Sequence, residues 1–66
     1  MNLKVNGEDV THQEGATLLE LIRLLHIEDK VMAAAVNMVI VKKDDWSTFY
    51  PKEGDKVELL HFVGGG

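Results

Sequence analysis

The C-terminus holds the residues best suited to chemistry, because three of the six glycines fill its last three positions. Gly64, Gly65 and Gly66 lack a Cβ atom, so this backbone can thread a narrow channel in conformations that other residues avoid. Three extended residues reach about 10 Å beyond a fold, and the group at their tip is the α-carboxylate of Gly66. We expect a flexible arm over residues 64–66 that delivers this carboxylate to another protein. A frayed terminus without a role is the alternative interpretation.

A carboxylate is a poor electrophile until it is converted to a mixed anhydride. ATP can do this by forming an acyl-adenylate, from which a nucleophile then displaces the nucleotide. The glycines at the C-terminus cannot form a phosphate-binding loop, which needs a helix after its glycines. The chain also has no cysteine, which excludes a disulfide framework, a zinc–thiolate site and a cysteine nucleophile. We therefore expect a carrier, activated by another protein, that holds its cargo on the terminal carboxyl group.

The other polar residues do not suggest catalysis or metal binding. His12, His26 and His61 are scattered over different elements without the spacing of metal ligands, so we expect them to be partly exposed or at the edge of the core. Asp44 and Asp45 are explained by solvation of a loop and by capping of a short turn. A chain this small also has little room for a substrate cavity of several hundred Å³. We expect no catalytic residue and no metal site.

Chain length and net charge limit the class of protein and its possible partners further. The 66 residues form at most one domain, and 45% hydrophobic with 27% charged residues is typical of a folded protein. A net charge of −4 disfavours nucleic-acid binding, which normally requires a basic face. No apolar run approaches the roughly 20 residues that span a bilayer, and no signal sequence is recognisable. We expect a single cytoplasmic domain over residues 1–66, with neither nucleic acid nor membrane as a partner.

The elements that would hold the arm begin with a hairpin. Apolar and polar residues alternate over residues 1–5, as in a strand with one buried face. Asn6 and Gly7 follow, a pair that favours the positive φ angles of a type I′ turn. The second strand is expected over residues 8–12.

One helix is predicted over residues 18–26. Thr17 and Glu20 have the spacing of a capping box, in which each side chain binds a backbone N–H of the other residue. The apolar residues behind this cap recur at helical spacing and mark the buried face. They are Leu18, Leu21, Ile22 and Leu25.

Three strands are predicted after the helix. Residues 31–36 form an unbroken apolar run that is too short for an exposed helix, which favours a buried strand. The last strand, over residues 56–63, places Val57 and Leu59 on one face and apolar residues on the other as well. Between them we expect a turn at Asn37 and Met38, a short strand over 39–41 and a helical turn over 44–46.

This order of elements predicts an α+β domain of two layers, with one main helix packed on one face of a small mixed sheet. The last strand can lie beside the first in parallel because a long crossover separates them. That is the β-grasp arrangement of ubiquitin-like proteins.

Several short motifs occur in a fixed order along the whole chain. They are Leu3-x-Val5-Asn6-Gly7, Thr17-Leu18-Leu19-Glu20-Leu21, Asn37 with Ile40, Val41, Lys43 and Trp46, Gly54-Asp55, and the terminal glycines. With its length, the chain resembles the sulfur carriers of the β-grasp superfamily, and most closely the ThiS-type carriers of thiamine biosynthesis. It departs from them at Lys42, where the family often has proline, and in having three terminal glycines where two are the minimum.

The resemblance implies a cycle that ends in thiazole formation. An E1-like adenylating enzyme would use ATP and magnesium to activate the carboxylate of Gly66. A cysteine desulfurase system would be the sulfur donor, delivering a persulfide that converts the adenylate to a thiocarboxylate. Thiazole synthase would then accept the sulfur. The resemblance thus implies that ATP, magnesium and sulfur are used by partner enzymes and that no cofactor is bound stably here.

Partner docking requires a surface near the arm. Leu60 and Phe62 on the outward face of the last strand are the first candidates, and Ile40 extends them. The alternative is that these side chains are covered within the fold. Trp46 is expected to be an anchor at the edge of the core.

Two other functions remain open. The chain could be a carrier like the small subunit of molybdopterin synthase, although those chains are usually longer. It could also be a β-grasp module that binds a partner noncovalently, in which case the glycine arm has no role.

Overall fold

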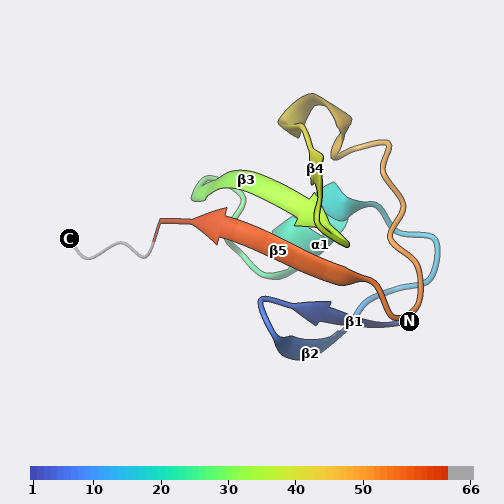
Figure 1. Cartoon of the computed structure of the whole chain (residues 1–66). Coiled ribbons are helices and arrows are strands. Elements are labelled where there is room, and N and C mark those ends of the chain that lie inside the picture. The colour runs from blue at the N-terminus through green and yellow to red at the C-terminus, as the bar shows by residue number, and fades with distance from the viewer. Residues whose placement is uncertain (63–66) are drawn as a thin grey trace.

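The computed structural model describes residues 1–62 and has a five-stranded sheet with a single α-helix on one face (Figure 1). Val63, predicted in the last strand, and the predicted arm of Gly64, Gly65 and Gly66 lie outside the described residues. The elements are β1 (Asn2–Val5), β2 (Glu8–Thr11), α1 (Leu18–Leu24), β3 (Val31–Val36), β4 (Val39–Val41), a 3-10 helix (Lys43–Asp45) and β5 (Lys56–His61).

The strands are ordered β2-β1-β5-β3-β4, with β5 in the centre. β1 and β5 are parallel, and the other neighbouring strands are antiparallel. The fold is therefore the predicted mixed sheet with one helix, in which the last strand lies beside the first. In the part of the chain that the structure describes, no helix is long and apolar enough to cross a membrane.

Two tight hairpin turns connect neighbouring strands. Asn6 and Gly7 have φ angles of 50° and 84°, and Asn37 and Met38 have φ angles of 50° and 69°. Positive φ at both central residues is the geometry of a type I′ turn. Both predicted turns are confirmed, although Met38 occupies a position at which glycine would avoid strain.

The N-terminus of α1 has the predicted capping box. The Thr17 hydroxyl accepts a hydrogen bond from the Glu20 N–H at 3.1 Å, and the Glu20 carboxylate accepts one from the Thr17 N–H at 2.8 Å. The first two helical N–H groups donate instead to the loop before β5: Leu18 to the Phe49 carbonyl at 2.8 Å and Leu19 to the Trp46 carbonyl at 3.0 Å. Otherwise unpaired helical donors thus fasten this loop to the helix.

The predicted C-terminus of the helix was wrong by two residues, because α1 ends at Leu24 and not at His26. His26 adopts a left-handed φ of 59°. Its N–H donates to the Arg23 carbonyl at 3.0 Å, and the Ile27 N–H donates to the Ile22 carbonyl at 3.4 Å. This pair of bonds is a Schellman motif, which turns the chain away from the helix axis toward β3.

The core lies between α1 and the sheet face that it covers. Trp46 is only 1% exposed, and its indole Nε1 donates to the Val41 carbonyl at 2.9 Å. It is an anchor as predicted, but it lies within the core and not at its edge. The remaining members of the core come from α1 and from four strands. They are Leu3, Val5, Leu18, Leu21, Ile22, Val31, Ala34, Val36, Val41, Val57 and Leu59.

β3 is a strand as predicted, but only one of its faces is fully buried. Its pairing with β5 shifts register between Val31 and Ala33, which brings Val31 into the core and leaves Met32 exposed. Val36 and Ala34 are buried on the same core face. The prediction of a wholly buried strand was therefore wrong, because α1 covers the sheet from one side.

Candidate functional site

The outward face of β5 carries the two predicted docking residues nearest to the C-terminus. Val57 and Leu59 point into the core, whereas Leu60 and Phe62 have exposed fractions of 61% and 64%. Phe62 follows the end of β5, and its N–H donates to the Lys30 carbonyl at 2.9 Å. The last described residues are thus fixed to the sheet while their large apolar side chains remain open to a partner.

The third predicted residue, Ile40 on β4, belongs to the same exposed sheet face and is 68% exposed. Ala35 on β3 pairs with Ile40, and Ala33 pairs with Leu60. The two alanine methyl groups form the floor of a shallow hollow of about 420 Å³ between the larger side chains. We call Ala33, Ala35, Ile40 and Leu60 the open-face patch. The alternative that Ile40, Leu60 and Phe62 are covered within the fold is therefore wrong.

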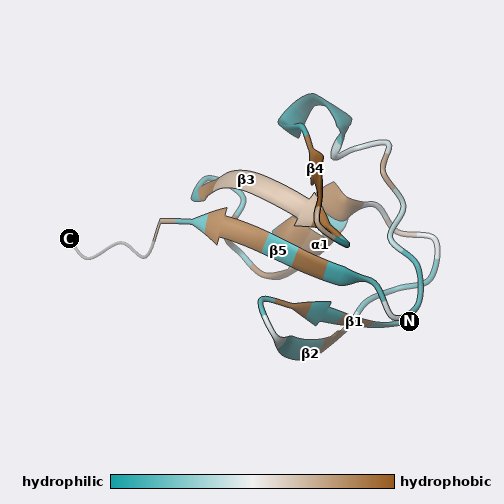
Figure 2. Cartoon of the chain, viewed as in Figure 1, coloured by the Kyte–Doolittle hydropathy of each residue, from teal (hydrophilic) through white to brown (hydrophobic). Residues whose placement is uncertain are grey.

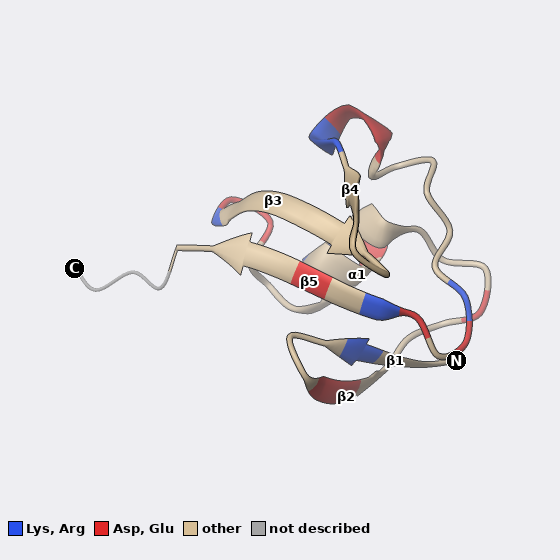
Figure 3. Cartoon of the chain, in the orientation of Figure 1, with Lys and Arg blue, Asp and Glu red and all other residues tan. Residues whose placement is uncertain are grey.

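Charge is absent from the strands that form this patch, except on β5. Figure 2 shows that β4 is hydrophobic throughout and that β5 alternates. Figure 3 shows basic and acidic colouring in the first half of β5, where the sequence has Lys56 and Glu58. β3 and β4 contain no Asp, Glu, Lys or Arg. An exposed apolar patch bordered by charged residues is typical of a protein docking surface.

Asn6 has a contact that the sequence analysis missed. Besides forming its turn, it borders the same hollow, and its side-chain amide lies against the backbone of β5. Its Oδ1 accepts from the Leu59 N–H at 2.8 Å, and its Nδ2 donates to the Leu59 carbonyl at 3.1 Å. The partners are 53 residues apart in the sequence, so no local pattern could have indicated this pair.

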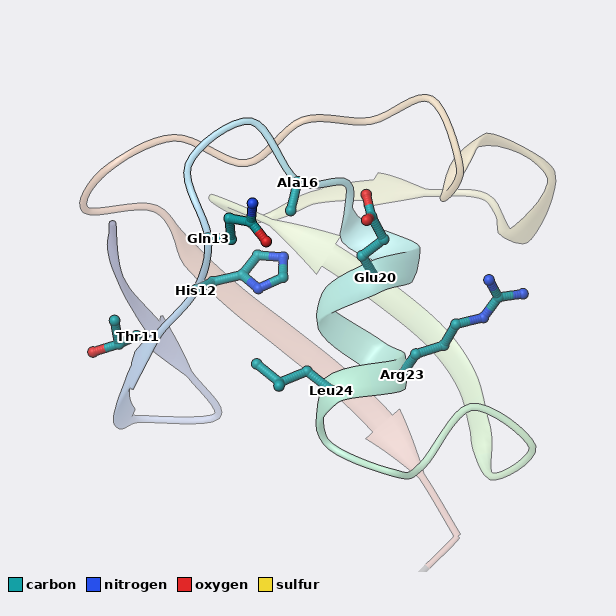
Figure 4. Close-up of a pocket in the computed structure, with 7 residues that line it drawn as sticks. All are labelled: Thr11, His12, Gln13, Ala16, Glu20, Arg23 and Leu24. Atoms are coloured by element: carbon teal, nitrogen blue, oxygen red, sulfur yellow. The ribbon is translucent and has the colours of Figure 1, made fainter.

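A second hollow, of about 670 Å³, lies between α1 and the segment that follows β2 (Figure 4). Its two charged side chains, Glu20 and Arg23, already have partners within the fold. Hydrogen bonds from the Thr17 N–H and hydroxyl hold the pKa of the Glu20 carboxyl below its usual range. The Glu28 carboxylate, 3.0 Å from Arg23 Nε, raises the pKa of that guanidinium. We therefore assign Glu20 and Arg23 a structural role and not a role in catalysis or ligand binding.

The histidines are separate, as the sequence analysis expected. His12 is buried beside the helix start, with Nε2 3.3 Å from the Thr17 carbonyl. His26 is exposed at the end of α1, and His61 is half-buried at the end of β5. Among the residues that the structure describes, none is a hydrogen-bond partner of His61 Nδ1. Within residues 1–62, no three His, Asp or Glu side chains come together as metal ligands would.

Comparison with known proteins agrees with this fold. The model of the ThiS family matches residues 1–66, which is the whole chain. The chain belongs to the ThiS family. The sulfur carrier protein ThiS of Bacillus subtilis is 31% identical over 65 residues, covering 97% of this chain and 98% of that protein. The crystal structure of a ThiS thiamine biosynthesis protein from Geobacter metallireducens superposes with a TM-score of 0.80 at 33% identity, and both chains are covered completely.

A longer protein also contains a region similar to this ThiS-family chain. The thiazole synthase of Paramagnetospirillum magneticum is 32% identical over 66 residues, which cover all of this chain but 20% of that protein. A second thiazole synthase, from Magnetococcus marinus, matches over the same share of its length at 30% identity. The chain therefore spans about a fifth of the thiazole synthases that it matches.

Proposed function

We propose that this chain is a sulfur carrier of thiamine biosynthesis, loaded as a thiocarboxylate on Gly66. The observation that carries the proposal is the match to the ThiS family, which extends over the whole chain and includes the terminal glycines. The relative of nearly the same length, from Bacillus subtilis, is named a sulfur carrier protein. In this role the chain is a co-substrate of partner enzymes and not a catalyst.

The proposed loading takes place in three steps on partner enzymes. A carboxylate oxygen of Gly66 attacks the α-phosphorus of ATP, giving an acyl-adenylate and pyrophosphate, with magnesium and ATP bound by an E1-like adenylating enzyme. A persulfide anion from a cysteine desulfurase system then attacks the acyl carbon, and AMP leaves. The product is an acyl disulfide that joins Gly66 to the donor's cysteine. A second thiol attacks the cysteine sulfur of the donor, so that the S–S bond breaks and a disulfide forms between the thiol and the donor. Gly66 then holds the thiocarboxylate.

The open-face patch is the proposed docking surface for these partners. Its member nearest to Gly66 in the sequence is Leu60, which lies on β5 six residues before Gly66, so a partner that covers the patch is close to the end of the strand that leads to the arm. Two thiazole synthases contain a region similar to this chain, and this supports the proposal that carrier and synthase are in direct contact. In the final step, the sulfur of the thiocarboxylate bonds to the acceptor on thiazole synthase. Water then attacks the acyl carbon, the C–S bond breaks, the sulfur stays with the acceptor, and the carboxylate of Gly66 is restored.

We also propose a cytoplasmic location for the cycle. Its persulfide and thiol steps require an environment in which thiols stay reduced. The absence of cysteine from the chain means that the carrier itself would not be oxidised to a disulfide there or elsewhere.

The test compares the native chain with a semisynthetic chain whose Gly66 carboxylate is converted to a carboxamide. Each is incubated with a ThiS-type adenylating enzyme, ATP, magnesium and a persulfide donor, and the C-terminal peptide is sequenced by tandem mass spectrometry. We expect sulfur on Gly66 of the native chain and none on the carboxamide, which cannot form an adenylate.

Peptide sequencing is needed because exchange of oxygen for sulfur adds almost the same mass as oxidation of one of the three methionines. An unmodified Gly66, with an enzyme that loads a known carrier, would contradict the proposal. Binding that is equal for the native chain and the carboxamide, without loading of either, would favour the noncovalent interaction module.

A further inference from the structure

β5 is the strand that leads to Gly66, and its two edges are held differently. On one edge, its pairing with β3 extends to Val31 opposite His61. On the other edge, its parallel pairing with β1 consists of Lys4 with Lys56 and Val5 with Val57. The second half of β5 therefore depends on other contacts for support on the β1 side.

Asn6 supplies this support, directly after β1 ends. Its backbone N–H donates to the Val57 carbonyl at 2.9 Å. Its side-chain amide then binds both backbone groups of Leu59, accepting from the N–H at 2.8 Å and donating to the carbonyl at 3.1 Å. An amide that exchanges two hydrogen bonds with one residue takes the place of a strand residue, although the chain of Asn6 has already entered its turn.

A second turn asparagine makes a similar contact at the opposite end of β5. The Asn37 N–H donates to the Lys56 carbonyl at 2.8 Å, and its Oδ1 accepts from the Lys56 N–H at 3.0 Å. Its Nδ2 donates to Asp55 Oδ1 at 3.0 Å. Asn6 and Asn37 share a φ of 50° and the first place in a two-residue turn. They differ in that Asn37 holds the start of β5 and Asn6 holds the half nearer to Gly66.

We propose that Asn6 is a positioning residue for the terminal carboxylate. Leu60 and His61 pair with β3, and the Phe62 N–H donates to the Lys30 carbonyl, so these residues are held on one side. By fixing Leu59 on the β1 side, Asn6 sets the direction of β5 as it approaches Phe62. Four residues span at most about 14 Å, so the course of the chain at Phe62 limits where Gly66 can be presented. This inference rests on the proposed function, because it assigns Asn6 a part in loading that Asn37 does not have.

The expected effect is on the rate of loading more than on docking. Misplacement of a reacting group by about 1 Å can cost roughly a hundredfold in rate, and Asn6 acts on the strand that ends five residues before Gly66. Ile40 and Leu60 of the open-face patch are both held by pairing with β3, whereas the side-chain hydrogen bonds of Asn6 are with β5. The docking surface should therefore largely persist when Asn6 is replaced.

The experiment compares Asn6→Gly with the matched variant Asn37→Gly in the full chain. Glycine accepts the positive φ of either turn, so each variant keeps its turn and loses one amide contact to β5. With adenylating enzyme, ATP and a persulfide donor, we expect Asn6→Gly to lower kcat for loading roughly tenfold to a hundredfold, with KM changed less than about threefold. Asn37→Gly should stay within about threefold of the native chain in both constants. Asn6→Asp, which keeps the acceptor for the Leu59 N–H, should restore part of kcat.

Amide exchange and N–H residual dipolar couplings are measured on the same variants without any partner. Asn6→Gly should speed exchange at Leu59 and reorient the N–H vectors of His61 and Phe62, whereas Asn37→Gly should leave these vectors in place. Equal kcat values for the two glycine variants, or unchanged vectors in Asn6→Gly, would overturn the inference. If an active enzyme does not load even the native chain, the proposed function fails and the couplings alone decide whether Asn6 orients β5. If Asn6→Gly does not fold, Asn6→Asp is judged by the same measurements.

Discussion

Ala33 lies directly opposite Leu60 in the antiparallel pairing of β3 with β5. The alanine methyl is too small to cover its neighbour, so the Leu60 side chain stands above the sheet instead of packing into a layer. Ala35 has the same relationship to Ile40 on the next strand. The exposure of the open-face patch is thus a consequence of small residues on β3, which leave a hollow between Ile40 and Leu60.

Leu60→Glu should weaken docking of both proposed partners. A carboxylate would enter an apolar contact beside Glu58, where its desolvation is unfavourable, and loss of a central contact residue typically raises Kd about tenfold or more. Binding is measured by isothermal titration calorimetry with adenylating enzyme and with thiazole synthase. The matched control is Leu24→Glu, since Leu24 is also exposed but lies on α1, at the other side of the sheet. If both substitutions affect Kd equally, the open-face patch is not the docking surface.

Met38→Gly should stabilise the fold. Met38 has a φ of 69°, which is unfavourable for a residue with a Cβ atom, and 88% of its surface is exposed, so little packing is lost. After the extra chain entropy of glycine is subtracted, we expect the free energy of unfolding to rise by about 0.5–1 kcal/mol. Thermal unfolding should shift upward by a few degrees. Met38→Ala removes the same side chain but keeps the strain, so a gain of equal size in that variant would contradict the explanation.

The parts of the fold that depend on neighbouring residues were readable from the sequence. Asn6 with Gly7 indicated its turn, and Thr17 with Glu20 indicated the helix start, because each signal acts within a few residues. The alternation of β5 similarly placed Leu60 outward. The docking candidates followed from this pattern together with the expectation of a helix on one face only.

Features that depend on distant contacts were not readable. The left-handed conformation of His26 follows from the path toward β3, and the register shift after Val31 depends on pairing with β5. The side-chain bonds of Asn6 to Leu59 connect residues 53 positions apart. Each of these needs a tertiary partner before it has any local advantage, so residue types and spacing do not reveal it.

The capping box should make stability depend on pH through Glu20. Hydrogen bonds from Thr17 lower the pKa of the folded Glu20 carboxyl, so its charged form stabilises the fold above the pKa of the unfolded chain. That contribution is lost as the pH falls through the lower, folded-state pKa. Urea unfolding over an acidic pH series should therefore show the native chain losing stability relative to Glu20→Gln. Thr17→Ala, which removes the hydroxyl but keeps the backbone donor, should reduce this dependence only in part. If the free energy of unfolding depends on pH in the same way for the native chain and for Glu20→Gln, the predicted role of Glu20 is wrong.

Trp46→Phe should destabilise the fold and also loosen the start of α1. Phenylalanine cannot donate to the buried Val41 carbonyl, and its smaller ring leaves unfilled space, so we expect a loss of about 2–4 kcal/mol in urea unfolding. The loop that Trp46 anchors also supplies the carbonyls that accept from the Leu18 and Leu19 N–H groups. Exchange of these two amides should therefore accelerate beyond the change in global stability.

Tyr50→Ala is the control for this loop. Tyr50 is an aromatic residue of the same segment, but it is exposed, so its loss should change the free energy of unfolding by less than about 0.5 kcal/mol. If amide exchange at Leu18 and Leu19 in Trp46→Phe accelerates no more than the change in global stability explains, the indole stabilises the core but not the start of α1. If exchange accelerates as expected, one buried side chain couples the β4 edge, next to Ile40 of the open-face patch, to the cap of the single helix.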